Sequence, residues 1–109
     1  MHASIRRYKI DPKNMDAVVK RIPGAVEVMG KLPGFKAYYV VKEAGGAFAT
    51  VSVFNDRAAA DQSVQTAAKW VKENAADLSI GTPEMVTGEV VAHKTAGNGG
   101  FAGSGVAGS

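Results

Sequence analysis

Arginine and tyrosine side chains gather in two segments whose other residues are typical of β-strands, and these side chains could carry polar chemistry. Arg6, Arg7 and Tyr8 stand together near the N-terminus, and Tyr38 and Tyr39 are adjacent further along the chain. A guanidinium group can stabilise an oxyanion, and a phenol can donate a hydrogen bond. Consecutive strand residues point to opposite faces, so only one of Tyr38 and Tyr39 can reach a given site. The alternative is that each arginine lies in solvent at a strand end.

Signatures of several other chemistries are missing from the sequence. The chain has no cysteine, which excludes disulfides, thiolate nucleophiles and cysteine-ligated metals. It has no P-loop, H-E-x-x-H or G-x-S-x-G motif. One G-x-G-x-x-G occurs, at residues 103–108, but it lies in the Gly-, Ala- and Ser-rich C-terminal segment and not between a predicted strand and a predicted helix, so nucleotide, flavin and zinc-hydrolase functions gain no support. His2 and His93 fall at the ends of the first and last predicted strands, where they could lie close together. A metal site needs a third ligand, which the sequence does not offer, so we expect no metal.

The middle of the chain is predicted to form a β-hairpin. Residues 35–41 and 47–54 are rich in Val, Tyr, Phe and Thr, which suit a pleated surface. The turn between them, residues 42–46, ends in two glycines that supply the backbone freedom of a hairpin loop. Pro33 and Gly34 end the preceding segment and lead the chain into the first of these strands.

A predicted helix lies on each side of the hairpin. The helix at residues 14–31 carries apolar residues at steps of three and four, although Pro23 should kink it or split it in two. The helix at residues 57–74 has an apolar stripe made mostly of alanine, with Trp70 at its edge. The outer strands are expected at residues 3–10 and 85–92. In the first of these neither face is cleanly apolar, so its pattern does not say which face is buried.

The resulting order, β-α-β-β-α-β, predicts an α+β protein with a ferredoxin-like fold. This fold is a four-stranded antiparallel sheet with two helices on one face. The other face would expose Val, Tyr and Phe side chains, so we expect a homodimer that covers it. Residues 1–95 are expected to form this single domain. Residues 96–109 are rich in Gly, Ala and Ser and are expected to be a flexible tail or linker.

Charge and hydropathy argue against two classes of partner. The formal net charge is +3, and the basic cluster of Arg6, Arg7 and Lys9 stands alone, so we expect no nucleic acid partner. The chain has no apolar run long enough to span a bilayer, and its N-terminus lacks the apolar segment of a secretory signal. We therefore expect no membrane association and a cytoplasmic location, which the absence of cysteine also fits.

Several segments carry a family resemblance. They are the strand IRRYKIDP, a helix ending in LPGF, the strand AYYVV, the strand–helix junction TVSVFNDRAAA and a final EVV. Over residues 3–93 this pattern resembles the antibiotic biosynthesis monooxygenase (ABM) superfamily, the dimeric α+β barrel group. The resemblance implies a homodimer with a ligand cavity in each subunit, between the helices and the sheet.

The resemblance also implies which residues line that cavity. Phe54, which ends the third strand, would face it, and alternation then adds Ser52, Thr50 and Phe48. Trp70 would form the opposite wall, and the tyrosines would donate hydrogen bonds to a phenol or quinone oxygen. The alternative is that the aromatic residues only pack in the core. The predicted substrate-binding residues are Arg6, Tyr8, Tyr39, Thr50, Ser52, Phe54 and Trp70.

The function implied by the resemblance is a monooxygenase that oxidises a small aromatic or quinol substrate without a cofactor. Haem-degrading members of the family carry a histidine ligand on the second helix, and residues 57–74 contain no histidine, so we expect no haem. We expect no other cofactor either. The alternative function is a non-catalytic small-molecule-binding or interaction module on the same barrel.

Overall fold

The structure, a computed structural model, describes residues 1–96. The predicted tail, residues 96–109, therefore lies outside the described residues except for Ala96. Within residues 1–96 no helix is long and apolar enough to cross a membrane. The described elements are β1 (His2–Lys9), η1 (Pro12–Asn14), α1 (Met15–Gly30), β2 (Phe35–Glu43), β3 (Ala47–Phe54), α2 (Arg57–Asn74), η2 (Ala76–Leu78) and β4 (Glu84–Glu89).

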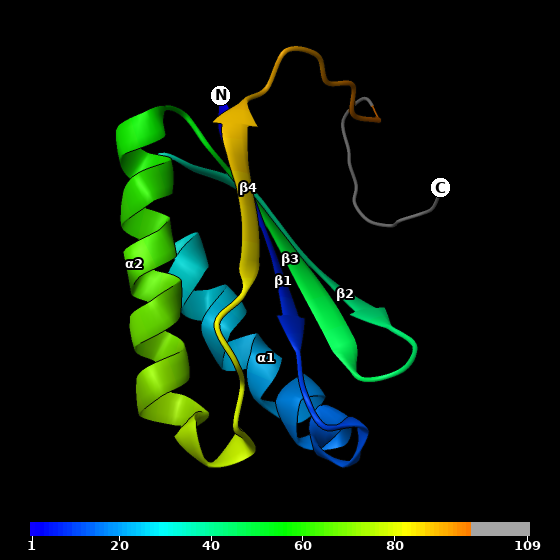
Figure 1. The fold of residues 1–109 in the computed structure, drawn as a ribbon. Coiled ribbons are helices and arrows are strands. Elements are labelled where there is room, and N and C mark those ends of the chain that lie inside the picture. The colour runs from blue at the N-terminus through cyan, green and yellow to red at the C-terminus, as the bar shows by residue number, and fades with distance from the viewer. Residues whose placement is uncertain (97–109) are drawn as a thin grey trace.

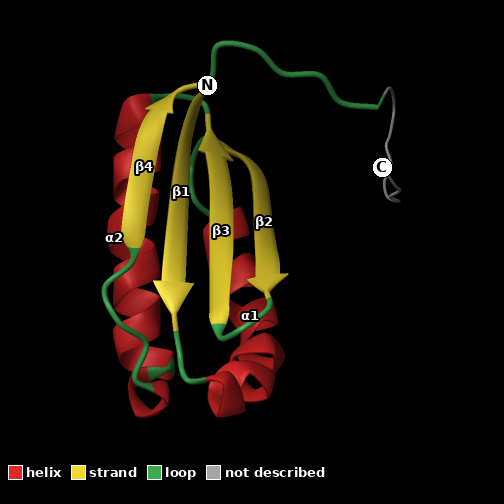
Figure 2. Cartoon of the chain, turned by 45° about the vertical axis from the view of Figure 1, so that its right-hand side comes forward, coloured by secondary structure: helices red, strands yellow, loops and turns green. Residues whose placement is uncertain are grey.

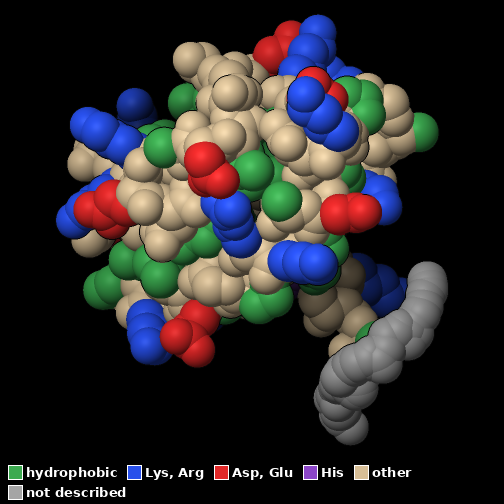
Figure 3. Space-filling view, turned by 90° about the horizontal axis from the view of Figure 1, so that it is seen from below, with side chains coloured by type: hydrophobic (Ala, Val, Ile, Leu, Met, Phe, Trp, Pro, Cys, Tyr) green, Lys and Arg blue, Asp and Glu red, His purple; other side chains and the backbone are tan. Residues whose placement is uncertain are grey.

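The four strands form one antiparallel sheet in the order β2-β3-β1-β4. Figure 1 and Figure 2 show both helices against one face of this sheet, while the other face carries no element of residues 1–96. The ferredoxin-like prediction is therefore confirmed. Charges of both signs are interspersed over the end of the molecule that Figure 3 shows.

The structure differs from the prediction at Pro23 and at the ends of several elements. Pro23 was expected to kink the first helix or to split it in two, and the structure contradicts the split: α1 continues through Pro23 from Met15 to Gly30 as one helix. Proline removes only one backbone donor, and Val18 and Met29, on either side of it, are both buried. The contacts of both halves with the sheet keep the helix in one piece. β4 ends at Glu89, before the predicted residue 92.

The structure shows which face of β1 is buried. Ser4, Arg6 and Tyr8 point toward the helices and are buried, while Ile5 on the other face is 43% exposed. In the register of β1 and β3 the three residues pair with Ser52, Thr50 and Phe48. The middle of the helix-covered face is therefore polar, which is unusual for a buried sheet face.

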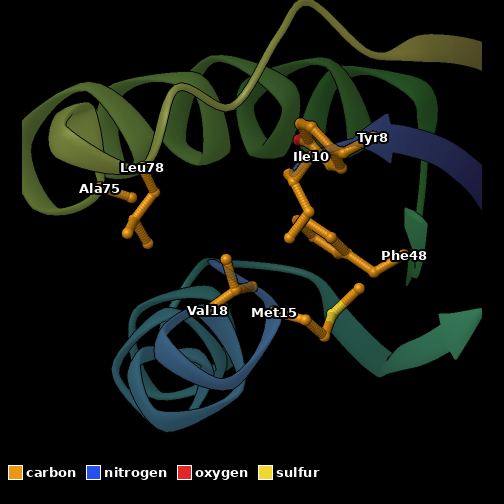
Figure 4. Packing of buried hydrophobic residues seen from close by; sticks show 7 residues of the cluster. All are labelled: Tyr8, Ile10, Met15, Val18, Phe48, Ala75 and Leu78. Atoms are coloured by element: carbon orange, nitrogen blue, oxygen red, sulfur yellow. The ribbon is translucent and has the colours of Figure 1, made fainter. Parts of the chain in front are cut away.

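Apolar residues at the two ends of the helices close the core around this polar strip. One cluster is built around Tyr8 and Phe48, whose rings stack with centroids 4.8 Å apart. Figure 4 shows Val18 and Met15 of α1 facing this cluster, with Leu78 and Ala75 beyond the end of α2. The members of the second cluster are Met29, Phe54, Ala60 and Ala67.

The turn between β2 and β3 is held against the end of β1. The backbone N–H of Ile10 donates to the carbonyl oxygen of Gly46 over 2.8 Å. Gly46 has a φ of +88°, and an added Cβ would lie 2.6 Å from the Ile10 carbonyl oxygen, so only glycine fits there. This contact fixes the end of the sheet that carries Tyr8.

Candidate functional site

A cleft of about 380 Å³ opens between α2, the middle of β1 and the segment that leads into β4. We call it the α2–β4 cleft. Its volume lies within the range of about 300–1,000 Å³ that is usual for small-molecule sites. Its walls are mostly apolar, with Arg6 and Tyr8 from the sheet as polar residues. The lining residues are Arg6, Tyr8, Val64, Ala68, Val71, Ile80, Gly81, Thr82, Pro83 and Met85.

A second, much smaller space lies on the other side of Tyr8 and Val71, which line both. This inner cavity has a volume of about 30 Å³, enough for one or two water molecules. Thr50 and Tyr38 from the sheet and Trp70 from α2 form part of its wall. The alanine-rich stripe of α2 contributes to both spaces, Ala67 to the inner cavity and Ala68 to the cleft. Small side chains on the helix thus leave the room that the two spaces occupy.

Arg6 is the most unusual residue of the site because its side chain is almost completely buried, with 1% exposed. Its Nε donates to Thr50 Oγ1 over 3.2 Å, and its Nη2 donates to Ser52 Oγ over 3.5 Å. Among the described residues Nη1 has no hydrogen-bond partner, and no carboxylate forms an ion pair with the guanidinium group. Burying a charge with only neutral partners costs several kcal/mol, so this arrangement needs a reason.

Arg7, the next residue, shows the ordinary arrangement. It points to the open face of the sheet, where its Nε and Nη2 donate to the carboxylate of Glu43 over 2.9 and 3.1 Å. Its Nη1 lies 3.4 Å from Glu84 Oε1. The carboxylates near this part of β1 are therefore paired with Arg7 on the face away from Arg6.

The phenols beside Arg6 are held in their protonated form. Burial raises the pKa of Tyr8 and of Tyr38, and the positive charge of Arg6 acts in the opposite direction on both. At neutral pH each hydroxyl is therefore a hydrogen-bond donor rather than a phenolate. A ligand in the α2–β4 cleft would meet Tyr8 as a neutral phenol beside a fixed positive charge.

The structure brings some of the predicted site residues together and separates others. Arg6 and Tyr8 line the α2–β4 cleft, and Thr50 and Trp70 line the inner cavity. Ser52 lies behind Arg6 and holds it, and it lines neither space. The remaining two predicted residues have other surroundings.

Phe54 and Tyr39 lie away from both spaces. Phe54 has no exposed surface and packs in the second apolar cluster, as the alternative reading of this residue foresaw. Tyr39 is 59% exposed on the open face of the sheet. Tyr38 takes the position toward the helices, because it pairs with Ser52 in the register of β2 and β3.

Sequence reasoning missed the outer wall of the cleft. Ile80, Pro83 and Met85 come from the connector and the start of β4, which carry no recognisable motif. Val71 of α2, which lines both the cleft and the inner cavity, was not predicted as a lining residue either. Within residues 1–96 no group of three or more His, Asp or Glu side chains could hold a metal ion.

Comparisons with known proteins bear on the family and the fold of the chain. The family model described as ABM, antibiotic biosynthesis monooxygenase, matches residues 1–69. No protein in the curated set matches the chain.

Solved structures share the fold at low sequence identity. A protein of unknown function from Nitrosomonas europaea is 23% identical with a TM-score of 0.73, over 89% of this chain and 95% of its own. A protein named antibiotic biosynthesis monooxygenase is also 23% identical, with a TM-score of 0.67 over 84% of this chain and 100% of its own. A variant of MhuD with two manganese protoporphyrin IX molecules bound per active site is 13% identical. Its TM-score is 0.70, over 88% of this chain and 100% of its own.

Proposed function

The chain belongs to the antibiotic biosynthesis monooxygenase family, and from this premise we propose that it oxidises a small aromatic or quinol substrate in the α2–β4 cleft without a cofactor. One observation supports this most directly. An apolar cleft of suitable size has a buried guanidinium group and a neutral phenol on its sheet side. Apolar walls suit a flat aromatic ring, and the two polar groups suit an oxygen atom on that ring.

In this reaction the protein would activate an electron-rich substrate toward dioxygen. A phenol or an anthrone becomes electron-rich when it loses a proton, and the positive charge of Arg6 would stabilise the resulting anion. For an anthrone, the methylene carbon becomes a carbonyl carbon, one oxygen atom of dioxygen enters the product, and the other leaves as water with the two hydrogens. Atoms and electrons balance without an external reductant.

The described residues would contribute position and electrostatics to this reaction. A bound ring would displace water from between the apolar walls, which would strengthen the attraction between the substrate anion and Arg6. Tyr8 would donate a hydrogen bond to the same oxygen, and its stacking on Phe48 keeps its ring in place. Holding the substrate in one orientation lowers the entropy cost of the reaction.

A second candidate function is binding without catalysis. It is favoured by the small number of polar groups in the cleft, where only Arg6, Tyr8 and Thr82 carry polar side chains. Such a site can hold a flat aromatic molecule without changing it. The two functions differ in what happens to dioxygen.

Oxygen consumption with a panel of dihydroxynaphthalenes and anthrones tests the proposal. We expect a rate above the spontaneous oxidation, and a decrease of at least tenfold, about 1.4 kcal/mol of barrier, in Tyr8→Phe or Arg6→Lys. Tyr39→Phe is the matched control because Tyr39 lies on the opposite face of the sheet, and its rate should equal that of the wild type. Saturable binding of the same compounds with no acceleration would contradict catalysis and favour the binder.

We also propose that the protein is a homodimer joined through the open face of the sheet. Ile5, Tyr39, Val41 and Val86 are large apolar residues on that face, and each is at least 43% exposed. Figure 2 shows no element over this face of the sheet within the described chain. A two-fold interface would let this surface cover its own copy. The α2–β4 cleft lies on the other side of the sheet, so each subunit would keep its own site.

A further inference from the structure

We infer that the α2–β4 cleft takes an aromatic ligand that carries an oxyanion, a carboxylate or a phenolate, and that Arg6 is the counter-charge for this group. The inference rests on the cleft of the proposed function, but it does not depend on any oxidation. The class of ligand is identified by a negative charge that would complement the positive charge of Arg6.

The first support is the way in which Arg6 is held. Thr50 and Ser52 accept hydrogen bonds from Nε and Nη2 and so fix the plane of the guanidinium group. Both are neutral, so the group is oriented but its charge is not compensated. Nη1 keeps a donor without a partner among the described residues. A planar oxyanion is the partner that suits such a donor.

The second support is the distribution of acidic residues. None of the residues that line the cleft or the inner cavity is acidic. Glu43 and Glu84 pair with Arg7 on the other face of the sheet. Arginine keeps its charge when it is buried, so this charge has to be met by something other than the described side chains.

The third support is the route to Arg6. Arg6 lines the cleft, and Met85 lies directly opposite it in the register of β1 and β4, on the same face of the sheet. Met85 is 49% exposed, and methionine is a flexible side chain that adapts easily to a neighbour. A ligand that displaces Met85 would place its ring on Val64, Ala68 and Val71 of α2, with its oxyanion toward Arg6.

Isothermal titration calorimetry with matched ligands tests the inference on the wild-type protein. The probes are 2-naphthoate and 2-naphthamide, which share shape and differ in charge. We expect the carboxylate to bind at least tenfold more tightly, which corresponds to about 1.4 kcal/mol. Equal affinity for the two, or binding of neither at millimolar concentration, would overturn the inference.

Variants show whether Arg6 is responsible for the preference. Arg6→Met should remove the preference for the carboxylate, and Arg6→Lys should retain part of it, because lysine keeps the charge but not the planar fork. Arg57→Met is the control, since Arg57 lies on the surface at the start of α2 and, among residues 1–96, pairs only with Asp61. If Arg6→Met does not fold, the comparison of the two ligands on the wild type still decides the question. Unchanged preference in a folded Arg6→Met protein would overturn the inference.

A pH series shows whether the site recognises a phenolate as well as a carboxylate. Between about pH 7 and pH 9 the affinity for 2-naphthoate should stay constant, because a carboxylate is ionised throughout. If a phenolate is also recognised, the affinity for 2-naphthol should rise about tenfold per pH unit below its own pKa. A rise assigns both groups to the site, and a constant affinity restricts the site to carboxylates. Anion-selective binding without oxygen consumption would support this inference while it contradicted the proposed catalysis.

Discussion

Two serines lie opposite each other on β1 and β3, and their hydroxyl groups have different surroundings. Ser4 and Ser52 pair in the register and have no exposed surface. Ser52 Oγ accepts from Arg6 over 3.5 Å and donates to the carbonyl oxygen of Ser4 over 3.4 Å. Ser4 Oγ has no partner among the described residues. The hydroxyl group of Ser52 therefore supports Arg6, whereas the hydroxyl group of Ser4 does not.

Replacing each serine with alanine should give unequal changes in stability. Ser52→Ala should lower the free energy of unfolding by about 1–3 kcal/mol, because the buried guanidinium group loses one of its two acceptors. The long distances favour the lower end of this range. Ser4→Ala should be neutral or slightly stabilising, because it removes a buried polar atom that has no partner. Urea denaturation of the two variants measures both values, and an equal loss in both would contradict this account of Arg6.

Tyr8 and Tyr38 should make the stability depend on alkaline pH. Burial raises the pKa of both above the ordinary value of 10.0, against the opposing effect of Arg6. The folded state therefore holds these protons more tightly than the unfolded state. The resulting stabilisation is complete below the unfolded pKa and is lost as the pH rises through the folded pKa.

Denaturation by urea from about pH 9 to about pH 11 tests this dependence. We expect the free energy of unfolding of the wild type to fall over this window, and to fall less steeply in Tyr8→Phe and in Tyr38→Phe. Parallel curves for the three proteins would show that neither buried phenol is responsible.

At the level of the elements, the alanine stripe of α2 and the register of β2 decide what the site contains. Ala67 and Ala68 leave space between the helix and the sheet. The register turns Tyr38 toward that space and Tyr39 away from it. The sequence predicts that only one of the two tyrosines can reach the site, but the choice depends on pairing between strands.

The sequence of α2 is also the basis of the prediction about haem binding. The helix, Arg57–Asn74, contains no histidine, and the family resemblance implies that a histidine on this helix is the haem ligand. We therefore expect titration with hemin, followed by the Soret band, to give no saturable stoichiometric binding with the spectrum of a histidine-ligated haem. Such a spectrum would show that another residue serves as the ligand. His2→Ala and His93→Ala would then identify it.

At the level of the whole molecule, the open face of the sheet is the feature that the proposed homodimer explains. We expect the protein to sediment at micromolar concentration with twice the chain mass of 11.3 kDa. An interface on the order of 1,600 Å² of total buried area is usual for a stable complex. A monomer under these conditions would contradict the proposed assembly.

A matched pair of substitutions tests whether the two subunits meet through the open face of the sheet. Ile5→Glu places a charge in the middle of the open face, where Ile5 is 43% exposed, and should give a monomer. Val26→Glu places the same charge on α1, where Val26 is 39% exposed, and should leave the dimer intact. Dissociation by both variants, or by neither, would mean that the subunits meet through a different surface.

The order and type of the elements follow from the sequence by itself. The boundaries of α2 and β3 agree with the predicted residues 57–74 and 47–54. These features depend on the local spacing of apolar residues, on turn glycines and on the cap at Asp56, whose side chain accepts from the N–H of Ala59. The uncovered sheet face follows from the element order in the same way.

The site itself was decided by the tertiary structure. Alternation along β1 places Arg6 and Arg7 on opposite faces, but no local pattern says which face the helices cover. Burying Arg6 and exposing Ile5 runs against the transfer preference of both side chains, so propensity alone would not predict it. It results from pairing with Thr50 and Ser52, which lie more than forty residues away in the chain. The outer wall of the cleft likewise forms only when the segment before β4 packs beside α2.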